Sequence, residues 1–246
     1  HFDIVLDDAI HNILESKAEY PVLMRKPWNA KMTGLLSVNT MAEFVSLVKQ
    51  IMKASTSKTE KITAPAVLAL VGPSGSGKRE ITEALCGTSE RTESGEIFVR
   101  PVNYCTEPGR YGHKYVPEEA FDRMNFFEKT AYAGVRYGTR KEDIQTLLDQ
   151  GKFAVIPVDM CGAIAMKRSF PTHIIYVARD KEKLIADIID SDYDTEEKTL
   201  RILSIDAEKR NRKICDYVIH NDTIEGERVS GAEEIRRLIL LEGEKY

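Results

Sequence analysis

A short glycine-rich segment carries the residues whose spacing most clearly suits chemistry. It reads GPSGSGK over residues 72–78, follows an apolar run and precedes a helical pattern. Glycines let the backbone curl so that successive N–H groups point at one anion, and a helix N-terminus adds partial positive charge. Lys78 would reach the terminal phosphates of a nucleoside triphosphate, whereas the alternative is a plain turn with a solvated lysine. The predicted phosphate-binding residues are Gly72, Pro73, Ser74, Gly75, Ser76, Gly77, Lys78 and Arg79.

The residue after this lysine is unusual for a phosphate loop. Arg79 stands where a Ser or Thr normally offers its hydroxyl to Mg²⁺. An arginine side chain has five donors and no lone pair for a cation. Mg²⁺ would therefore be held through water or by other residues, and we expect the Arg79 cation to supply part of the positive charge that binds the triphosphate.

Short apolar runs alternate with helical patterns along most of the chain, as in a parallel sheet with crossover helices. The runs typical of buried strands lie at 67–72, 97–102, 153–158, 173–178 and 216–220. Two clear helical patterns lie between such runs, at 140–151 and 195–213. The sequence therefore predicts an α/β fold with a central, mostly parallel sheet.

A polar segment at 53–65, rich in Ser, Thr and Lys, has the composition of a linker. We place a boundary there, between an N-terminal extension of unknown role at 1–62 and a larger domain at 63–246. Within the extension, the spacing of apolar residues predicts an amphipathic helix at 41–52 behind a short strand at 31–38.

Composition narrows the classes of partner. The net charge of −4 and the mixed-sign surface residues give no basic stripe, so we expect no nucleic acid as a partner. The chain has no run of 18 apolar residues and no signal-peptide pattern at its start, so we expect a cytoplasmic protein with no membrane partner. Its four cysteines are far apart and form no CxxC pair, which argues against a zinc site or a disulfide framework.

Residues 126–178 resemble the guanylate kinase family, in which an FxE motif, a YGT motif and a strand ending in Asp-x-Asp occur in this order. With the glycine loop and YVIHND at 217–222, the resemblance spans about residues 66–225. It implies a P-loop kinase with a GMP-binding insertion at about 97–140 and a mobile lid at about 184–212. Such an enzyme transfers the γ-phosphate of ATP to GMP with the help of Mg²⁺.

The resemblance also implies roles for individual residues. Lys78 and Asp159 match catalytic positions, and Asp159 is the candidate ligand for Mg²⁺. The positions implied for the acceptor nucleotide are Arg110, Glu128, Tyr137 and Thr139, and those on the adenine side are Asn221 and Asp222. The Glu128 carboxylate could accept hydrogen bonds from N1–H and N2–H₂ of guanine together. Without the resemblance, Glu128 could be a solvated acid, Tyr137 a packed ring and Thr139 the N-cap of the next helix.

Several positions depart from the family pattern. Pro157 replaces the first Asp of Asp-x-Asp, and the arginine-rich phosphate clamp is reduced to YCTEPGR at 104–110. An ungapped match of the lid arginines falls on Asp187, Ser191 and Ile202. Arg201 could replace the arginine matched by Ile202, but adjacent helical residues point about 100° apart, so this would need a shifted helix.

These observations support two functions from different classes. The first is nucleotide binding with weak or altered phosphorylation of GMP or a related nucleoside monophosphate by ATP, because one lid arginine can change a phosphoryl-transfer rate by about 10³-fold. The alternative is a catalytically inactive guanylate-kinase-like binding or regulatory module, with a protein partner reached through the extension at 1–62. A kinase for a different monophosphate also stays open, because the acceptor clamp changed most.

Overall fold

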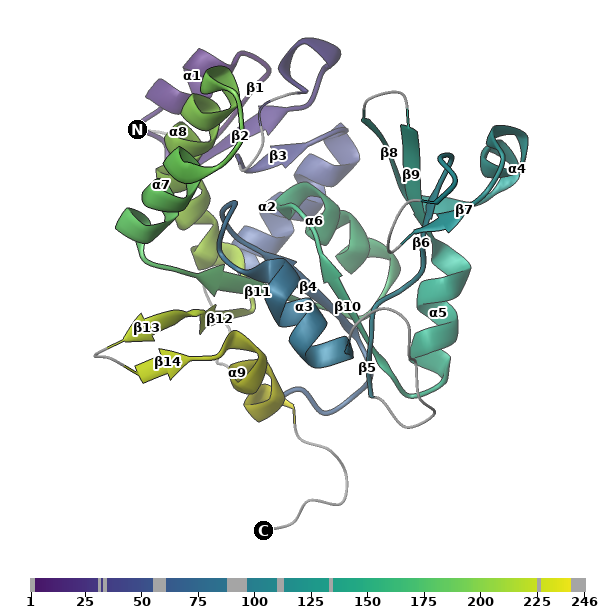
Figure 1. Cartoon of the computed structure of the whole chain (residues 1–246). Coiled ribbons are helices and arrows are strands. Elements are labelled where there is room, and N and C mark those ends of the chain that lie inside the picture. The colour runs from purple at the N-terminus through teal and green to yellow at the C-terminus, as the bar shows by residue number, and fades with distance from the viewer. Residues whose placement is uncertain are drawn as a thin grey trace.

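The computed structural model describes residues 3–30, 32, 35–54, 61–87, 97–109, 113–132, 135–224 and 227–239. A five-stranded sheet forms its centre (Figure 1), and every strand pairing within it is parallel. The strands, in spatial order, are β12 (Tyr217–His220), β11 (Thr172–Ala178), β4 (Val67–Val71), β10 (Phe153–Pro157) and β5 (Phe98–Val99). This arrangement confirms the predicted α/β fold with a central parallel sheet.

The central strand β4 is buried on both of its faces, which explains its unbroken apolar sequence. Val67, Ala69 and Val71 belong to the apolar core on one face of the sheet, and Leu68 and Leu70 belong to the core on the other. This alternation follows from the two-residue period of a strand. The helices therefore cover both faces of the sheet.

Residues of α2 (Met41–Ala54) and α6 (Met160–Ser169) pack in the first of these two cores, and residues of α3 (Lys78–Cys86) and α9 (Gly231–Leu238) pack in the second. The remaining long helices are α5 (Lys141–Asp149), α7 (Lys181–Asp190) and α8 (Thr195–Asn211). The last two pack on each other through the buried Leu184, Ile188 and Ile205. A short 3-10 helix, η2 (Arg212–Ile214), follows α8.

A second sheet of four strands stands apart from the central one in Figure 1. Its strands are β7 (Lys114–Tyr115), β6 (Asn103–Cys105), β9 (Val135–Arg140) and β8 (Phe126–Tyr132), and α4 (Glu118–Arg123) lies between β7 and β8 in the chain. The buried rings of Tyr104, Phe121 and Phe126 form its own small core. These elements occupy the region that the sequence analysis assigned to an acceptor-binding insertion.

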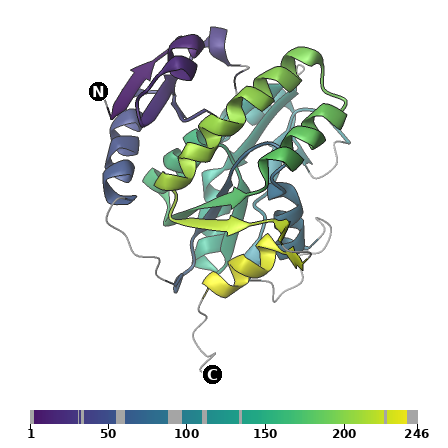
Figure 2. The same cartoon turned by 90° about the vertical axis from the view of Figure 1, so that its left-hand side faces the viewer.

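The N-terminal residues form a third, parallel sheet with the order β1 (Ile4–Asp7), β2 (Tyr20–Met24) and β3 (Ser37–Val38). Two short helices, α1 (Ile10–Glu15) and η1 (Pro27–Asn29), belong to the same region. The predicted helix at 41–52 corresponds to α2, whereas the strand expected at 31–38 comprises, among the described residues, only Ser37–Val38. In Figure 2 these purple elements lie beside the light green α8.

A hairpin of β13 (Asp222–Ile224) and β14 (Glu227–Val229) precedes α9. None of the helices in the described part of the chain has the length and apolar content that a bilayer crossing requires.

Candidate functional site

The glycine loop connects the carboxyl end of β4 to α3 and fits closely against the neighbouring strand ends. Gly72 has φ +140°, and a Cβ there would lie 2.7 Å from the Val177 carbonyl oxygen of β11. Gly77 has φ +90°, and its Cβ would lie 1.9 Å from Nδ2 of Asn221, just after β12. Glycine is needed at both positions because a side chain there would be strained and would overlap its neighbour. The carboxyl ends of parallel strands are where α/β sheets bind ligands.

The amine of Lys78 lies inside this loop. It donates hydrogen bonds to the Gly72 carbonyl at 2.5 Å and the Pro73 carbonyl at 2.8 Å. Burial lowers the pKa of Lys78, and the nearby Glu208 carboxylate opposes that shift. The buried hydroxyl of Ser76 has no hydrogen-bond partner within the described ranges. The loop thus presents a buried cation and an unsatisfied hydroxyl, both suited to phosphate oxygens.

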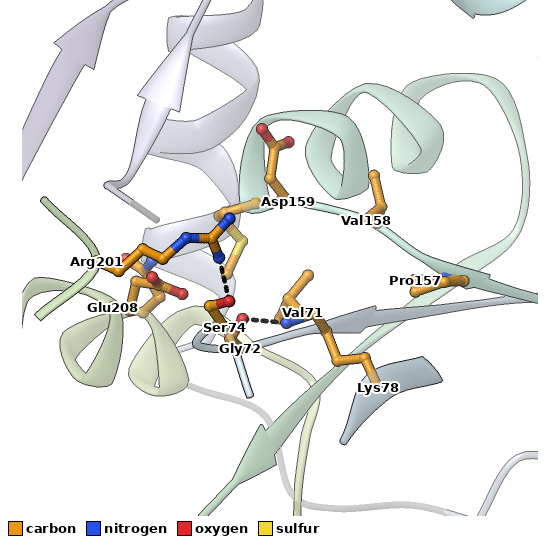
Figure 3. Close-up of a pocket in the computed structure, with 11 residues that line it drawn as sticks. Val71, Gly72, Ser74, Lys78, Pro157, Val158, Asp159, Arg201 and Glu208 are labelled. Atoms are coloured by element: carbon orange, nitrogen blue, oxygen red, sulfur yellow. Dashed lines mark hydrogen bonds between the residues drawn. The ribbon is translucent and has the colours of Figure 1, made fainter. Parts of the chain in front are cut away.

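A pocket of about 340 Å³ opens beside the loop (Figure 3). Three parts of the chain form it: the loop with α3, the end of β10 with the start of α6, and α8. Its lining residues are Val71, Gly72, Ser74, Lys78, Pro157, Val158, Asp159, Met160, Arg201, Glu208 and Asn211. The two catalytic residues predicted from the sequence, Lys78 and Asp159, therefore lie in one pocket.

Arg201 extends from α8 to the glycine loop. Its guanidinium donates a hydrogen bond to the Ser74 hydroxyl, drawn as a dashed line in Figure 3. It also pairs with Glu197 at 2.6 Å and lies over the Tyr193 ring at 4.0 Å. The neighbouring Ile202 packs instead in the apolar core between α7 and α8. The structure therefore places Arg201 at the pocket and Ile202 away from it. This is the arrangement in which Arg201, and not Ile202, stands at the place of the lid arginine.

A second arginine at the loop was missed by the sequence analysis. Arg179 follows β11 directly and donates a hydrogen bond to the Gly75 carbonyl at 2.5 Å. Asp187 of α7 pairs with the same guanidinium at 2.6 Å. Its position at the carboxyl end of a central strand was the signal that could have identified it. Asp187 stands at a position matched to a lid arginine of the family. Its carboxylate holds Arg179 next to the loop.

Glu208 is another pocket residue that the sequence analysis missed. Its side chain comes from α8 and is only 7% exposed, and the Ser204 hydroxyl donates to it at 3.0 Å. Burial raises the pKa of Glu208, while the Lys78 ammonium opposes that shift. The signal in the sequence was its spacing of seven residues from Arg201, which puts the two on one helical face.

Asp159 caps the N-terminus of α6. One carboxylate oxygen accepts a hydrogen bond from the Gly162 N–H at 2.7 Å, and the other lies 3.7 Å from the Arg25 guanidinium. Nowhere in the described ranges do three or more His, Cys, Asp or Glu side chains gather as a metal site. Mg²⁺ commonly uses one or two carboxylates together with substrate phosphates and water. A carboxylate on the wall of a phosphate pocket therefore fits Mg²⁺ held mainly by nucleotide and water.

The side chain of Arg79 does not take the place expected for it. It is 74% exposed and pairs with Glu83, one turn further along α3, at 2.9 Å. The first turn of α3 directs the Arg79 cation away from the pocket in this arrangement, and its expected part in binding the triphosphate stays a prediction. Its backbone N–H still lies among the first four of α3, which have no carbonyl partner within the helix.

Of the predicted acceptor residues, Glu128, Tyr137 and Thr139 lie on the four-stranded sheet, and none of these three lines the pocket. Glu128 of β8 and Thr139 of β9 are cross-strand partners, and the Tyr137 ring lies 5.3 Å from the ring of His113. Arg110 falls outside the described residues. Thr139 is not the N-cap of α5, because that position is Arg140. Their role in acceptor binding stays a prediction.

The residues predicted for the adenine side connect the end of β12 to the loop and to α7. The Asn221 amide donates to the Ser76 carbonyl at 3.2 Å. Asp222 accepts a hydrogen bond from the Asp180 N–H at 2.8 Å and pairs with Lys183. Both side chains thus support the loop and the start of α7, and contact with adenine stays a prediction.

Comparison with known proteins gives a consistent assignment. A family model described as guanylate kinase matches residues 64–235. A guanylate kinase of Chlamydia trachomatis is 27% identical over 191 residues, which cover 72% of this chain and 88% of that protein. A guanylate kinase of Wolinella succinogenes is 30% identical over 170 residues, which cover 63% of this chain and 76% of that protein. The glycine loop, Lys78 and Asp159 all fall within the matched residues, and the chain belongs to the guanylate kinase family.

Proposed function

We propose that this protein is an ATP-dependent nucleoside monophosphate kinase whose acceptor is GMP or a related monophosphate. The observation that carries the proposal is the hydrogen bond from Arg201 to Ser74, which brings a lid arginine to the loop that also holds Lys78. Phosphoryl transfer depends on positioning and on cations around the transferred group. The ungapped match to the family left no arginine at the three lid positions. Arg201 of α8 is the cation that we assign to this role.

The proposed reaction assigns a role to each pocket residue. The loop N–H groups, the N-terminus of α3 and Lys78 bind the β- and γ-phosphates of ATP. An oxygen of the acceptor phosphate attacks the γ-phosphorus, the bond to the β–γ bridging oxygen breaks, and ADP leaves with that electron pair. Arg201 and Arg179 stabilise the negative charge on the transferring group. Mg²⁺, when bound beside Asp159, supplies further positive charge to the phosphates.

The acceptor would bind on the four-stranded sheet, through Glu128, Tyr137, Thr139 and Arg110. The cross-strand pairing of Glu128 with Thr139 supports this assignment, because it holds the two residues next to each other. A carboxylate that accepts from N1–H and N2–H₂ would select guanine over adenine. The loss of Asp at position 157 and the reduced clamp at 104–110 argue for altered acceptor binding.

A specific observation also favours nucleotide binding without turnover. Both arginines at the loop are paired with carboxylates, Arg201 with Glu197 and Arg179 with Asp187. Their charge is therefore partly neutralised, which would weaken transition-state stabilisation. Under this second function the protein is a binding or regulatory module, with a partner protein bound through residues 1–62.

A coupled assay of ADP release separates the two functions. ATP and Mg²⁺ are combined with GMP, dGMP, AMP, CMP or UMP, for the unmodified protein, Lys78→Ala and a control, Lys141→Ala, which removes an exposed lysine of α5. Turnover of about 1–10³ s⁻¹ that only Lys78→Ala abolishes supports the kinase. A shift of the melting temperature by ATP without turnover supports the binding module. No shift at millimolar ATP contradicts both.

A further inference from the structure

The N-terminal elements from β1 to α2, residues 4–54, are named here the N-terminal unit. This unit packs on α6 and α8, two of the helices that carry pocket residues (Figures 1 and 2). The match to the family model begins at residue 64, so the unit precedes the part of the chain that the family describes. Two of its contacts with these helices, one apolar and one ionic, involve pocket residues or their direct neighbours.

The apolar contact fixes one face of α8. Four buried residues of the N-terminal unit form a small core against which Leu200 and Ala207 of α8 pack. These two are seven residues apart and share one helical face, and each is followed directly by a pocket residue, Arg201 or Glu208. The core residues of the unit are Ile13, Leu23, Met32 and Leu35. The helix therefore lies with one face on the N-terminal unit and the adjacent face on the pocket.

The end of α8 is held by the same unit. The buried Gln50 amide of α2 donates to the Ile214 carbonyl of η2 at 3.0 Å. Lys213 of η2 pairs with Glu19 of the unit at 2.9 Å. These contacts follow α8 directly in the chain, so the helix is restrained both along its face and at its C-terminal end.

The ionic contact reaches Asp159. Arg25, which directly follows β2, donates from Nε to the Ser37 hydroxyl at 3.0 Å and from Nη1 to the Met32 carbonyl at 2.5 Å. These two bonds orient its remaining nitrogen, Nη2, which lies 3.7 Å from the Asp159 carboxylate. The Arg25 side chain is 15% exposed and the Asp159 side chain 47%, so the cation is largely shielded from solvent while the carboxylate is partly open to it. Because two fixed acceptors hold the planar guanidinium, its free edge faces the Asp159 carboxylate in a set orientation.

We propose that the N-terminal unit is a positioning element of the phosphate pocket. Its core sets the position of α8, and with it Arg201 and Glu208, while Arg25 orients Asp159 and balances its charge against the triphosphate. Leu200 and Arg25 are thus positioning residues that act through other side chains. The expected effect on ATP binding rests on the proposed function. The expected effect on the position of α8 rests on packing alone.

The first test measures hydrogen exchange of the full chain without nucleotide. Leu200→Ala removes a contact with the N-terminal unit, and Leu203→Ala shortens an exposed leucine of the same helix. We expect faster exchange across α8 in Leu200→Ala, with unchanged exchange in α5 as a check against general destabilisation. Exchange of α8 that is equal in Leu200→Ala, Leu203→Ala and the unmodified protein overturns the proposal, whatever the protein binds.

The second test measures ATP affinity by titration calorimetry, with EDTA and with Mg²⁺. Arg25→Met leaves the Asp159 charge unbalanced, so we expect about fivefold weaker binding of metal-free ATP, at the low end of coupling between sites. Mg²⁺ can neutralise the freed carboxylate, so binding of Mg²⁺–ATP should fall less. Arg25→Lys should restore part of the metal-free affinity because it keeps the charge.

Two controls separate this effect from loosening of the unit. Ser37→Ala removes one of the bonds that hold Arg25 but keeps its charge, and Arg168→Met removes an exposed arginine from the last turn of α6. Both should bind metal-free ATP within twofold of the unmodified protein. An equal loss with EDTA and with Mg²⁺ in Arg25→Met, or an equal loss in Ser37→Ala, overturns the role of Arg25. If the unmodified protein binds no ATP, the proposed function fails and hydrogen exchange alone decides the positioning of α8.

Discussion

The guanidinium of Arg201 donates a hydrogen bond to the hydroxyl of Ser74, although 127 positions separate the two residues in the chain. Arg201 belongs to α8 and Ser74 to the glycine loop, so this bond joins the helix predicted as a lid to the loop predicted to bind phosphate. The pairs of Arg201 with Glu197 and with the Tyr193 ring keep the guanidinium at that place. The helix α8 therefore approaches the glycine loop with the cation of Arg201 already bonded to a loop residue.

Replacing this arginine tests whether its charge serves the reaction. We expect Arg201→Met to weaken ATP binding about tenfold and to lower turnover by about 10³-fold, the effect typical of an arginine at a transferring phosphoryl group. The measurements are titration calorimetry and the coupled assay of ADP release. Arg210→Met, on the exposed last turn of α8, is the matched control and should behave as the unmodified protein. Equal kinetics for both variants would show that Arg201 has no part in transfer.

Arg79 offers a test of metal binding. Its side chain pairs with Glu83 on the surface, so Arg79→Ser should leave the affinity for metal-free ATP unchanged. The new hydroxyl stands at the position that binds Mg²⁺ in phosphate loops, so the gain in affinity from Mg²⁺ should increase. Arg79→Ala removes the same charge without adding a hydroxyl and should show no such gain. Weaker binding in EDTA for both variants would mean that the Arg79 cation reaches the phosphates.

Gly77 lies so close to Asn221 that any side chain at position 77 should lower the free energy of unfolding and distort the loop. In Gly77→Ala the Cβ would overlap the Asn221 amide, and φ of +90° strains an alanine by about 1–2 kcal/mol. We expect loss of ATP binding and a lower free energy of unfolding, measured in urea. Gly151→Ala is the control, since it has φ +76° but no atom within 4 Å of the added Cβ, and it should lose only the strain. Adding Asn221→Ala should recover part of the loss in Gly77→Ala but none in Gly151→Ala.

The buried carboxyl of Glu208 makes stability depend on pH. Because burial raises its pKa in the folded protein, the folded state favours protonated Glu208. The stabilisation from protonated Glu208 is complete below the pKa of this carboxyl in the unfolded chain. It is lost as pH rises through the pKa of Glu208 in the folded protein. Glu208→Gln stays neutral and can still accept from Ser204, so its melting temperature should exceed that of the unmodified protein near pH 7 and converge with it below pH 4.5.

The control for this pH series is Glu182→Gln, which neutralises an exposed glutamate at the start of α7. Its melting temperature should follow that of the unmodified protein at every pH. A lower melting temperature of Glu208→Gln near pH 7 would show that attraction between Glu208 and Lys78 outweighs the cost of burial.

The sequence predicted the central sheet well because its inner strands are largely buried. A strand such as β4, covered on both faces, consists almost wholly of apolar residues. It can be recognised in the sequence without knowledge of the strands that pair with it. The helical spacing of apolar residues located the N-terminal helix at 41–52. It overestimated the strands at 31–38 and 97–102, which the structure describes as pairs of residues, Ser37–Val38 and Phe98–Val99. Short edge strands depend on pairing with neighbours, and a single sequence does not contain that pairing.

The sequence by itself determined the glycine loop, Lys78 and the place of Asp159 at a strand end. Each depends on consecutive residues, because a strand, a turn of glycines and a helix fix the path of the backbone locally. Tertiary structure decided which cations lie at the glycine loop. Packing of Ile202 between α7 and α8 rotates Arg201 toward Ser74, the end of β11 brings Arg179 to Gly75, and the first turn of α3 directs Arg79 outward. Helix rotation and docking are set by apolar contacts between distant segments, and motif spacing does not encode them.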